Sequence, residues 1–80
     1  MFYVYVLKSL RYPEQIYIGY TVDLKRRLFE HNEGLSLHTS KYIPWEVEVY
    51  VGFKNEHKAI EFEKYLKSGS GTVFRNKKLL

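Results

Sequence analysis

The residues best suited to acid–base and phosphate chemistry gather around one strand-to-helix corner, in the stretch QIYIGYTVDLKRRLFEH. Its helical part carries a single stripe at the spacing i, i+3, i+4 and i+7, made of Leu24, Arg27, Leu28 and His31. Because the two leucines must face a sheet, Arg27 and His31 are expected to point toward the body of the protein. Three neighbours are expected to face solvent: Lys25, Arg26 and Glu30.

A second predicted helix carries an inward carboxylate at the same spacing. Its stripe consists of Ala59, Phe62, Glu63 and Leu66. An inward charge is costly unless it is paired, hydrogen-bonded or bound to a cation. The sequence leaves two explanations open for Arg27 and Glu63: a structural salt bridge between them at the sheet edge, or a shared functional site.

Two tyrosines on neighbouring strands are the third candidate group. Tyr17 and Gly19 share one face of a predicted strand, so the missing side chain of Gly19 is expected to leave open space beside Tyr17. Tyr5 lies on the preceding strand and is expected to meet Tyr17 across a hairpin. The alternative is that both tyrosines simply pack across the strands.

The pattern along the chain predicts the elements that position these residues. Alternating β-branched and aromatic residues indicate strands at 2–8, 16–20 and 45–51. Helices are expected at about 23–33, 55–67 and 72–78. Thr21 or Asp23 is the predicted N-cap of the first helix and Asn55 that of the second, whereas Gly34 and the SGSG run end them.

The element order ββαβα(α) predicts an α+β fold, in which helices flank a small three-stranded antiparallel sheet. Eighty residues are enough for one domain, 1–80, and 45% hydrophobic and 18% aromatic residues are enough for its core. The chain has no cysteine, which excludes disulfides and thiolate metal sites and suits a reducing, cytoplasmic setting. No membrane span or signal peptide is expected, and the formal charge of +4 favours a polyanionic partner.

Taken together, these motifs resemble the GIY-YIG nuclease family, whose catalytic domain occurs in homing endonucleases, restriction enzymes and an excision-repair nuclease subunit. The two signatures appear as YVY (3–5) and YIG (17–19), followed by TVDLKRRLFEH and AIEFEKYLKSGSG, and the likeness covers nearly the whole chain. Tyr3 and Val4 replace the Gly and Ile of the first signature. Tyr20 stands where some members have a lysine, and Asn76 is a weak match to a late asparagine.

The resemblance implies five catalytic positions: Tyr5, Tyr17, Arg27, His31 and Glu63. Arg27 is expected to stabilise the transition state through its fixed, always-charged fork. A single carboxylate such as Glu63 suits Mg²⁺ or Mn²⁺, which keep most of their waters. A tyrosine is a poor base at neutral pH without help, and Tyr17 is the slightly preferred contact of the attacking water. His31 either positions Tyr17, binds phosphate or is an ordinary helix histidine.

The expected partner is DNA, reached through a set of backbone-contacting positions: Gly19, Lys41, Lys67, Arg75 and Lys77. The alternative for the lysines is plain solubility, and the SGSG run either presents amides to a phosphate or only stops a helix. The predicted function is a metal-dependent DNA endonuclease of low sequence specificity, because no separate reading domain is apparent. It is expected to be a monomer or weak dimer, with a further protein for targeting. The competing readings are an inactive nucleic-acid-binding module and a purely structural domain.

Overall fold

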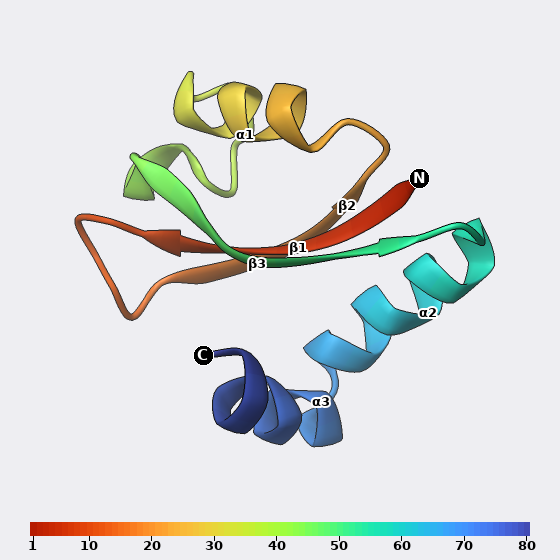
Figure 1. Cartoon of the computed structure of the whole chain (residues 1–80). Helices are drawn as coiled ribbons and strands as arrows, with labels where there is room; N and C mark the ends of the chain where they lie inside the picture. Colours follow the sequence, from red (N-terminus) through yellow and green to blue (C-terminus); the bar gives the residue numbers. More distant parts are fainter.

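A three-stranded antiparallel sheet forms the middle of the protein in a computed structural model that describes residues 1–80. The strands are β1 (Phe2–Ser9), β2 (Ile16–Thr21) and β3 (Trp45–Phe53), in the order β2-β1-β3. Strand β1 is therefore central and hydrogen-bonds to a neighbour on each side (Figure 1). The hairpin from β1 to β2 and the later return of β3 follow the alternation in the sequence.

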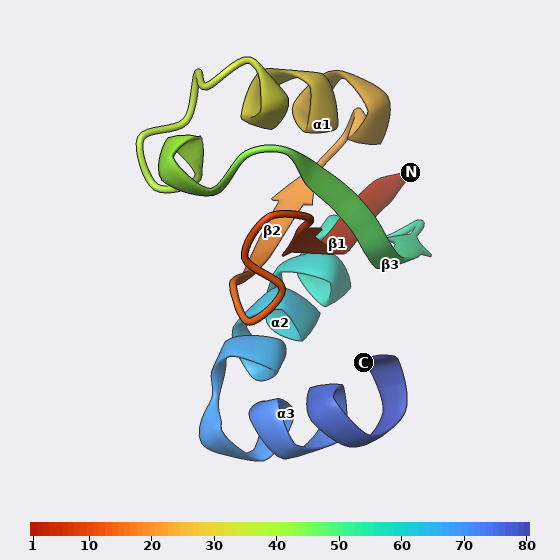
Figure 2. The same cartoon turned by 90° about the vertical axis from the view of Figure 1, so that its left-hand side faces the viewer.

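The helices cover both faces of the sheet. Helix α1 (Leu24–Asn32) lies on one face, whereas α2 (Glu56–Lys67) and α3 (Gly69–Phe74) lie on the other (Figures 1 and 2). Asp23 caps α1 by accepting a hydrogen bond from an amide of the first turn, and Asn55 caps α2 in the same way. Gly34 follows α1 at a φ of 76°, a left-handed conformation that ends a helix readily only at glycine.

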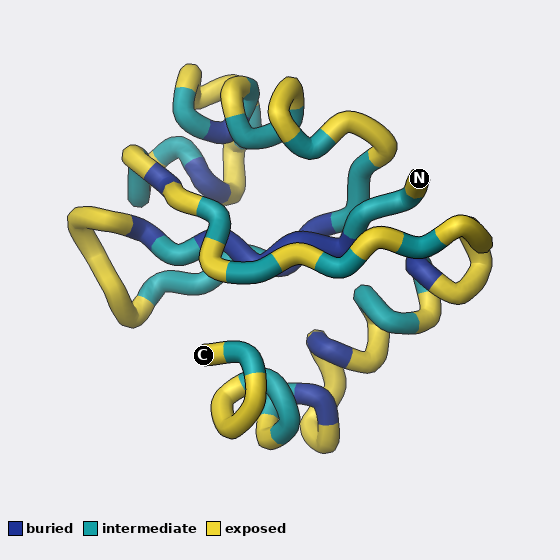
Figure 3. Tube along the Cα trace, in the orientation of Figure 1, coloured by how far each residue is buried: buried dark blue, intermediate teal, exposed yellow.

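Two separate clusters of side chains pack against the two faces. The apolar core fills the face toward α2 and α3 and is built on Val4, Val6, Ile18, Ala59 and Leu66. The α1-side cluster fills the opposite face and is built on Tyr5, Leu7 and Trp45. Because successive side chains of a strand point to opposite faces, β1 supplies both clusters in alternation, and most of its length is buried (Figure 3).

The α+β class, the ββαβα(α) order and the antiparallel sheet are confirmed. The main differences lie at the C-terminal end of the chain. The SGSG run does not only end α2, because the Ser68 hydroxyl accepts from the amide of Gly71 and so also begins α3. The tail expected as one helix at 72–78 is α3 followed by a wider turn at Arg75–Leu79. No helix has the length and apolar content needed to cross a membrane.

Candidate active site

Tyr5 and Tyr17 lie side by side on the sheet face that α1 covers. Tyr5 is directly opposite Gly19 in the β1–β2 ladder, and Tyr17 is two pairs along on the same face, opposite Leu7. The two rings are tilted, with centroids 6.3 Å apart. A Cβ at Gly19 would overlap the hydroxyl end of Tyr5 and come within 3.0 Å of Tyr17. The expected open space beside Tyr17 is therefore filled by the Tyr5 phenol, which needs the glycine beneath it.

His31 joins this pair from the last turn of α1. Its Nε2 lies 3.0 Å from the Tyr5 hydroxyl, and its Nδ1 lies 2.7 Å from the Thr39 hydroxyl. The imidazole also packs on the Tyr17 ring, at a centroid distance of 4.9 Å. Of the three roles that the sequence left open for His31, the geometry favours positioning, with Tyr5 rather than Tyr17 as its hydrogen-bond partner.

Burial keeps both members of the Tyr5–His31 pair uncharged. Tyr5 is 1% exposed, and burial raises its pKa to about 12, although hydrogen bonding with Arg27 acts in the opposite direction. Burial, reinforced by the Arg27 charge, lowers the pKa of His31 to about 4. A neutral phenol therefore faces a neutral imidazole at pH 7.

Arg27 is held at the edge of this cluster by a neighbour on its own helix. Its Nη1 lies 3.0 Å from Glu30, whose other oxygen accepts from Arg26 at 3.3 Å. Burial opposes the Arg27 charge, but hydrogen bonding with Glu30 and with Tyr5 outweighs burial and raises the pKa of Arg27. Its side chain is 33% exposed, so the guanidinium remains within reach of a phosphate.

The structural salt bridge considered between Arg27 and Glu63 is not formed. Arg27 pairs with Glu30 instead, and Glu63 pairs with Lys67 at 3.1 Å, one turn along its own helix. The physical reason is that α1 and α2 lie on opposite faces of the sheet, whereas each observed partner is three or four residues away. The expectation that Glu30 faces solvent is likewise only partly met, since its side chain is 27% exposed.

Glu63 lies on α2, and its negative charge affects Tyr5 and Tyr20 electrostatically. Its charge contributes to the raised pKa values of Tyr5 and Tyr20, after the larger effects of burial at Tyr5 and of a hydrogen bond at Tyr20. That hydrogen bond, 2.6 Å from the Tyr20 hydroxyl to Glu56, fastens the end of β2 to the first turn of α2. No three carboxylate, histidine or cysteine side chains gather as a ready cation cage. One partly exposed carboxylate fits a hard cation that keeps its waters.

The predicted DNA-contacting residues do not share one surface. Lys41 is exposed on the short turn Ser40–Tyr42, on the α1 side, whereas Lys67, Arg75 and Lys77 are on the side of α2 and α3 (Figure 2). Arg75 is half-buried, and its Nη1 lies 3.5 Å from the Leu66 carbonyl. Gly19 is buried beneath Tyr5. Their contact with DNA stays a prediction.

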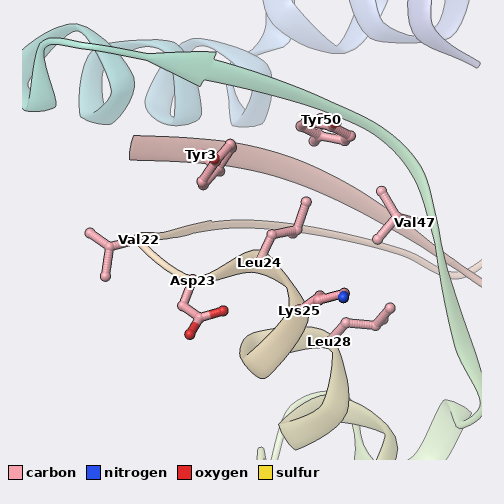
Figure 4. Close-up of a pocket in the computed structure, with 8 residues that line it drawn as sticks. All are labelled: Tyr3, Val22, Asp23, Leu24, Lys25, Leu28, Val47 and Tyr50. Atoms are coloured by element: carbon pink, nitrogen blue, oxygen red, sulfur yellow. The ribbon is translucent and has the colours of Figure 1, made fainter. Parts of the chain in front are cut away.

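A shallow apolar groove of about 460 Å³ lies on the other flank of α1. Figure 4 shows Tyr3 and Tyr50 on the strands facing Leu24 and Leu28 on the helix. None of the five predicted catalytic residues lines it. The groove is therefore separate from the tyrosine–histidine cluster.

Sequence reasoning missed three residues, in α1 and in the loop after it, that hold the site in place. Thr39 is 1% exposed and binds His31, and the side-chain amide of Asn32 brackets the Trp45 backbone at 2.6 and 3.0 Å. Glu30 was assigned to solvent although it fixes Arg27. A loop threonine eight residues after the histidine has no periodic signal, so only the folded loop reveals it.

Comparison with known proteins matches this arrangement to a family. A family model of the GIY-YIG catalytic domain matches residues 1–78. The chain belongs to the GIY-YIG family. This confirms the predicted family and, with it, the prediction of an endonuclease-type domain. In GIY-YIG terms, Tyr5 and Tyr17 end and begin the two signatures, and Gly19 closes the second.

Several relatives carry the GIY-YIG domain in different settings. "Structure-specific endonuclease subunit SLX1" of Candida dubliniensis is 43% identical over 70 residues, covering 79% of this chain and 24% of that protein. An SLX1 homolog of Drosophila persimilis is 42% identical over 58 residues, covering 66% and 20%. A "UPF0213 protein in ldhD 5'region" of Pediococcus acidilactici is 36% identical over 72 residues, covering 86% and 71%. The chain thus spans about a fifth of the SLX1 proteins.

Proposed function

We propose that this GIY-YIG domain is a metal-dependent endonuclease that hydrolyses phosphodiester bonds in DNA with low sequence specificity. The proposal rests on one observation. Tyr17 and Arg27 are partly exposed, and they lie next to the Tyr5–His31 pair, which is buried and neutral. The names of the SLX1 relatives describe structure-specific endonuclease subunits, which supports DNA as the substrate class.

Phosphodiester hydrolysis needs an activated water, neutralisation of charge on the phosphoryl oxygens and help for the leaving oxygen. Arg27 meets the second need, since its partly exposed fork can bind two phosphate oxygens. Tyr17 is the more accessible of the two signature tyrosines and is our choice for contact with the attacking water. Tyr5 is sealed behind Tyr17 and acts as a neutral support.

Glu63 would hold the divalent cation, Mg²⁺ or Mn²⁺, by its carboxylate. When bound, such an ion supplies Lewis-acid stabilisation of phosphoryl charge. To serve in this way, Glu63 must exchange its contact with Lys67 for the cation, and this exposed pair is weak enough to be exchanged.

Low sequence specificity is proposed because the site residues match the phosphate and not the base edges. Guanidinium and phenol groups that face a phosphate carry no sequence information. We propose that a further protein supplies targeting, since the SLX1 relatives are named as subunits.

The test is nicking of supercoiled plasmid in Mg²⁺ or Mn²⁺ by wild type, Arg27→Ala and Glu63→Gln. The matched control is Arg26→Ala, because Arg26 binds the same Glu30 but its side chain is 75% exposed. We expect a rate loss on the order of 100-fold or more for Arg27→Ala and Glu63→Gln and a near-normal rate for the control. Equal rates in all four proteins would show that the nicking does not come from this site.

A binding module without turnover is the second candidate. The observation that favours it is the combination of a sealed Tyr5 and a Glu63 already paired with Lys67. Such a module would retard DNA in a gel at a salt-dependent affinity and would leave plasmid intact at every metal concentration.

A further inference from the structure

A buried hydrogen-bond chain runs from Tyr5 through His31 to Thr39. The Tyr5 hydroxyl lies 3.0 Å from His31 Nε2, and the Thr39 hydroxyl lies 2.7 Å from His31 Nδ1. All three side chains are at most 1% exposed. The direction of the hydrogen bonds along this chain decides whether the Tyr5 hydroxyl donates its proton to His31 or keeps that proton free.

The direction is set at the Thr39 end, because that hydroxyl has one proton and two neighbouring acceptors. One acceptor is His31 Nδ1 at 2.7 Å, and the other is the Ser36 carbonyl at 3.5 Å. The Ser36 carbonyl already accepts from the amides of Thr39 and Ser40, at 3.2 and 3.0 Å. Two amides occupy both of its lone pairs. The 2.7 Å contact with His31 Nδ1 is also much shorter than the 3.5 Å contact with the carbonyl, so Thr39 donates to His31.

The positions of the His31 and Tyr5 protons follow from this direction of the Thr39 hydrogen bond. An imidazole that accepts at Nδ1 and is neutral must carry its proton on Nε2. The Nε2–H then donates to the Tyr5 oxygen, and the observed 3.0 Å is the usual length of such a bond. The Tyr5 oxygen receives this hydrogen bond, and its own O–H is not used by His31.

We propose that Thr39 is a positioning residue whose hydroxyl fixes His31 as the Nε2–H tautomer. The Tyr5 oxygen then accepts from His31, and this hydrogen bond holds the buried Tyr5 ring beside Tyr17 and Arg27, where the phosphate is proposed to bind. The opposite tautomer would turn the Tyr5 proton toward Nε2 and reverse the hydrogen bond that holds the Tyr5 ring. The tautomer itself is independent of the proposed nuclease function, whereas its catalytic consequence rests on that function.

The loop around Thr39 is rigid enough for this role. The Thr39 carbonyl accepts from the indole Nε1 of the buried Trp45 at 2.9 Å. Asn32 ties the Trp45 backbone to the end of α1. These contacts use the Thr39 backbone and not its hydroxyl. Thr39→Val therefore removes only the hydroxyl from a side chain of the same branched shape, and Thr39→Ser keeps the hydroxyl.

The first experiment reads the tautomer directly. Nitrogen-15 spectra of the imidazole groups at pH 7 distinguish a protonated from an unprotonated ring nitrogen, and comparison with His31→Gln assigns the His31 signals. We expect Nε2–H in wild type and Thr39→Ser, and a shift toward Nδ1–H or a mixture in Thr39→Val. A wild-type spectrum with the proton on Nδ1 would overturn the proposal, whatever the activity.

The second experiment measures plasmid nicking and DNA affinity of the same variants. We expect a loss of about 10- to 100-fold in the nicking rate for Thr39→Val, an unchanged DNA affinity, and recovery in Thr39→Ser. An equal loss in both variants, or full activity in Thr39→Val, would remove Thr39 from the reaction. If wild type cuts no DNA, the proposed nuclease function fails, and the spectra still decide the tautomer.

Discussion

The two faces of the sheet are packed by different chemistry. The face toward α2 and α3 carries the apolar core, whose five buried members are all aliphatic. The face toward α1 carries a buried tyrosine, a buried histidine and a buried threonine linked by hydrogen bonds. One strand supplies both, because Val4, Tyr5 and Val6 alternate across β1.

The two clusters therefore differ in what they depend on: the apolar core depends on shape, and the polar cluster depends on its hydrogen bonds. Aliphatic burial tolerates small changes of shape at a cost of about 1 kcal/mol each. A buried polar chain depends on every partner, since a donor left unpaired costs about 1–3 kcal/mol and also changes the remaining protons. Substitutions in the polar cluster on the α1 side should therefore damage activity, in some cases together with stability, whereas small changes in the apolar core should damage stability alone.

The largest contrast is expected between adjacent residues of β2. Tyr17→Phe removes a hydroxyl on the α1 side and should lower the nicking rate by about 1,000-fold with little change in stability. Ile18→Val trims the apolar core and should lower the free energy of unfolding by about 1 kcal/mol with a normal nicking rate at 25 °C. Nicking and urea unfolding of both variants check this, and a stability loss in Tyr17→Phe would mean that the hydroxyl is structural.

The second prediction concerns Gly19, which lies between the two tyrosines. Gly19→Ala places a methyl group against the Tyr5 hydroxyl and the Tyr17 ring. We expect a roughly 100-fold loss of nicking from displaced rings together with about 1–3 kcal/mol of overpacking. Gly69→Ala is the control, because nothing lies within 4 Å of an added Cβ there. A silent Gly19→Ala would contradict the described packing of Tyr5.

The third prediction uses pH to probe the polar face alone. Burial lowers the His31 pKa to about 4, below its value in the unfolded chain, so the unfolded state binds more protons between about pH 6.5 and 4. Stability from this source is complete above pH 6.5 and should fall by roughly 2–3 kcal/mol as the pH drops toward 4.

Urea unfolding at several pH values measures this loss, and His31→Gln removes its cause. The variant should be less stable at pH 7 but flatter between pH 6.5 and 5. The other histidines, His38 and His57, are exposed and remain in the variant as an internal control. An identical slope in both proteins would place the titration elsewhere.

The smallest expected effect concerns Glu63 on the opposite side of the sheet. Lys67→Met removes the ammonium that binds Glu63, and an exposed pair of this kind contributes at most about 1 kcal/mol. The dissociation constant for Mn²⁺, measured by water relaxation without DNA, should therefore fall by about 2- to 5-fold. Lys64→Met, on the same helix, is the control. Tighter Mn²⁺ binding in both variants would point to general charge and not to Glu63.

The sequence was sufficient for what depends on periodicity. The stripe of α1 placed Arg27 and His31 on the inner side, and the alternation of β1 and β2 placed Tyr5 next to Tyr17. It was insufficient where two helices had to be assigned to faces of the sheet, which is why an Arg27–Glu63 salt bridge stayed open as an explanation until the structure showed other partners for both. Thr39 was missed because a loop has no periodic pattern. Glu30 was missed because the position of a residue on a helix does not show that its flexible side chain can reach a neighbour such as Arg27.

The central position of β1 has a consequence for the lifetime of the site. Amides that are hydrogen-bonded on both sides of a strand, between two packed clusters, exchange with solvent only when the whole domain opens. Tyr5 sits in such a strand, while Arg27 stands on a nine-residue helix with an exposed outer surface. Partial opening would therefore release α1 first, with Arg27, the proposed phosphate-binding residue, and would leave Tyr5 in place for the helix to pack against again.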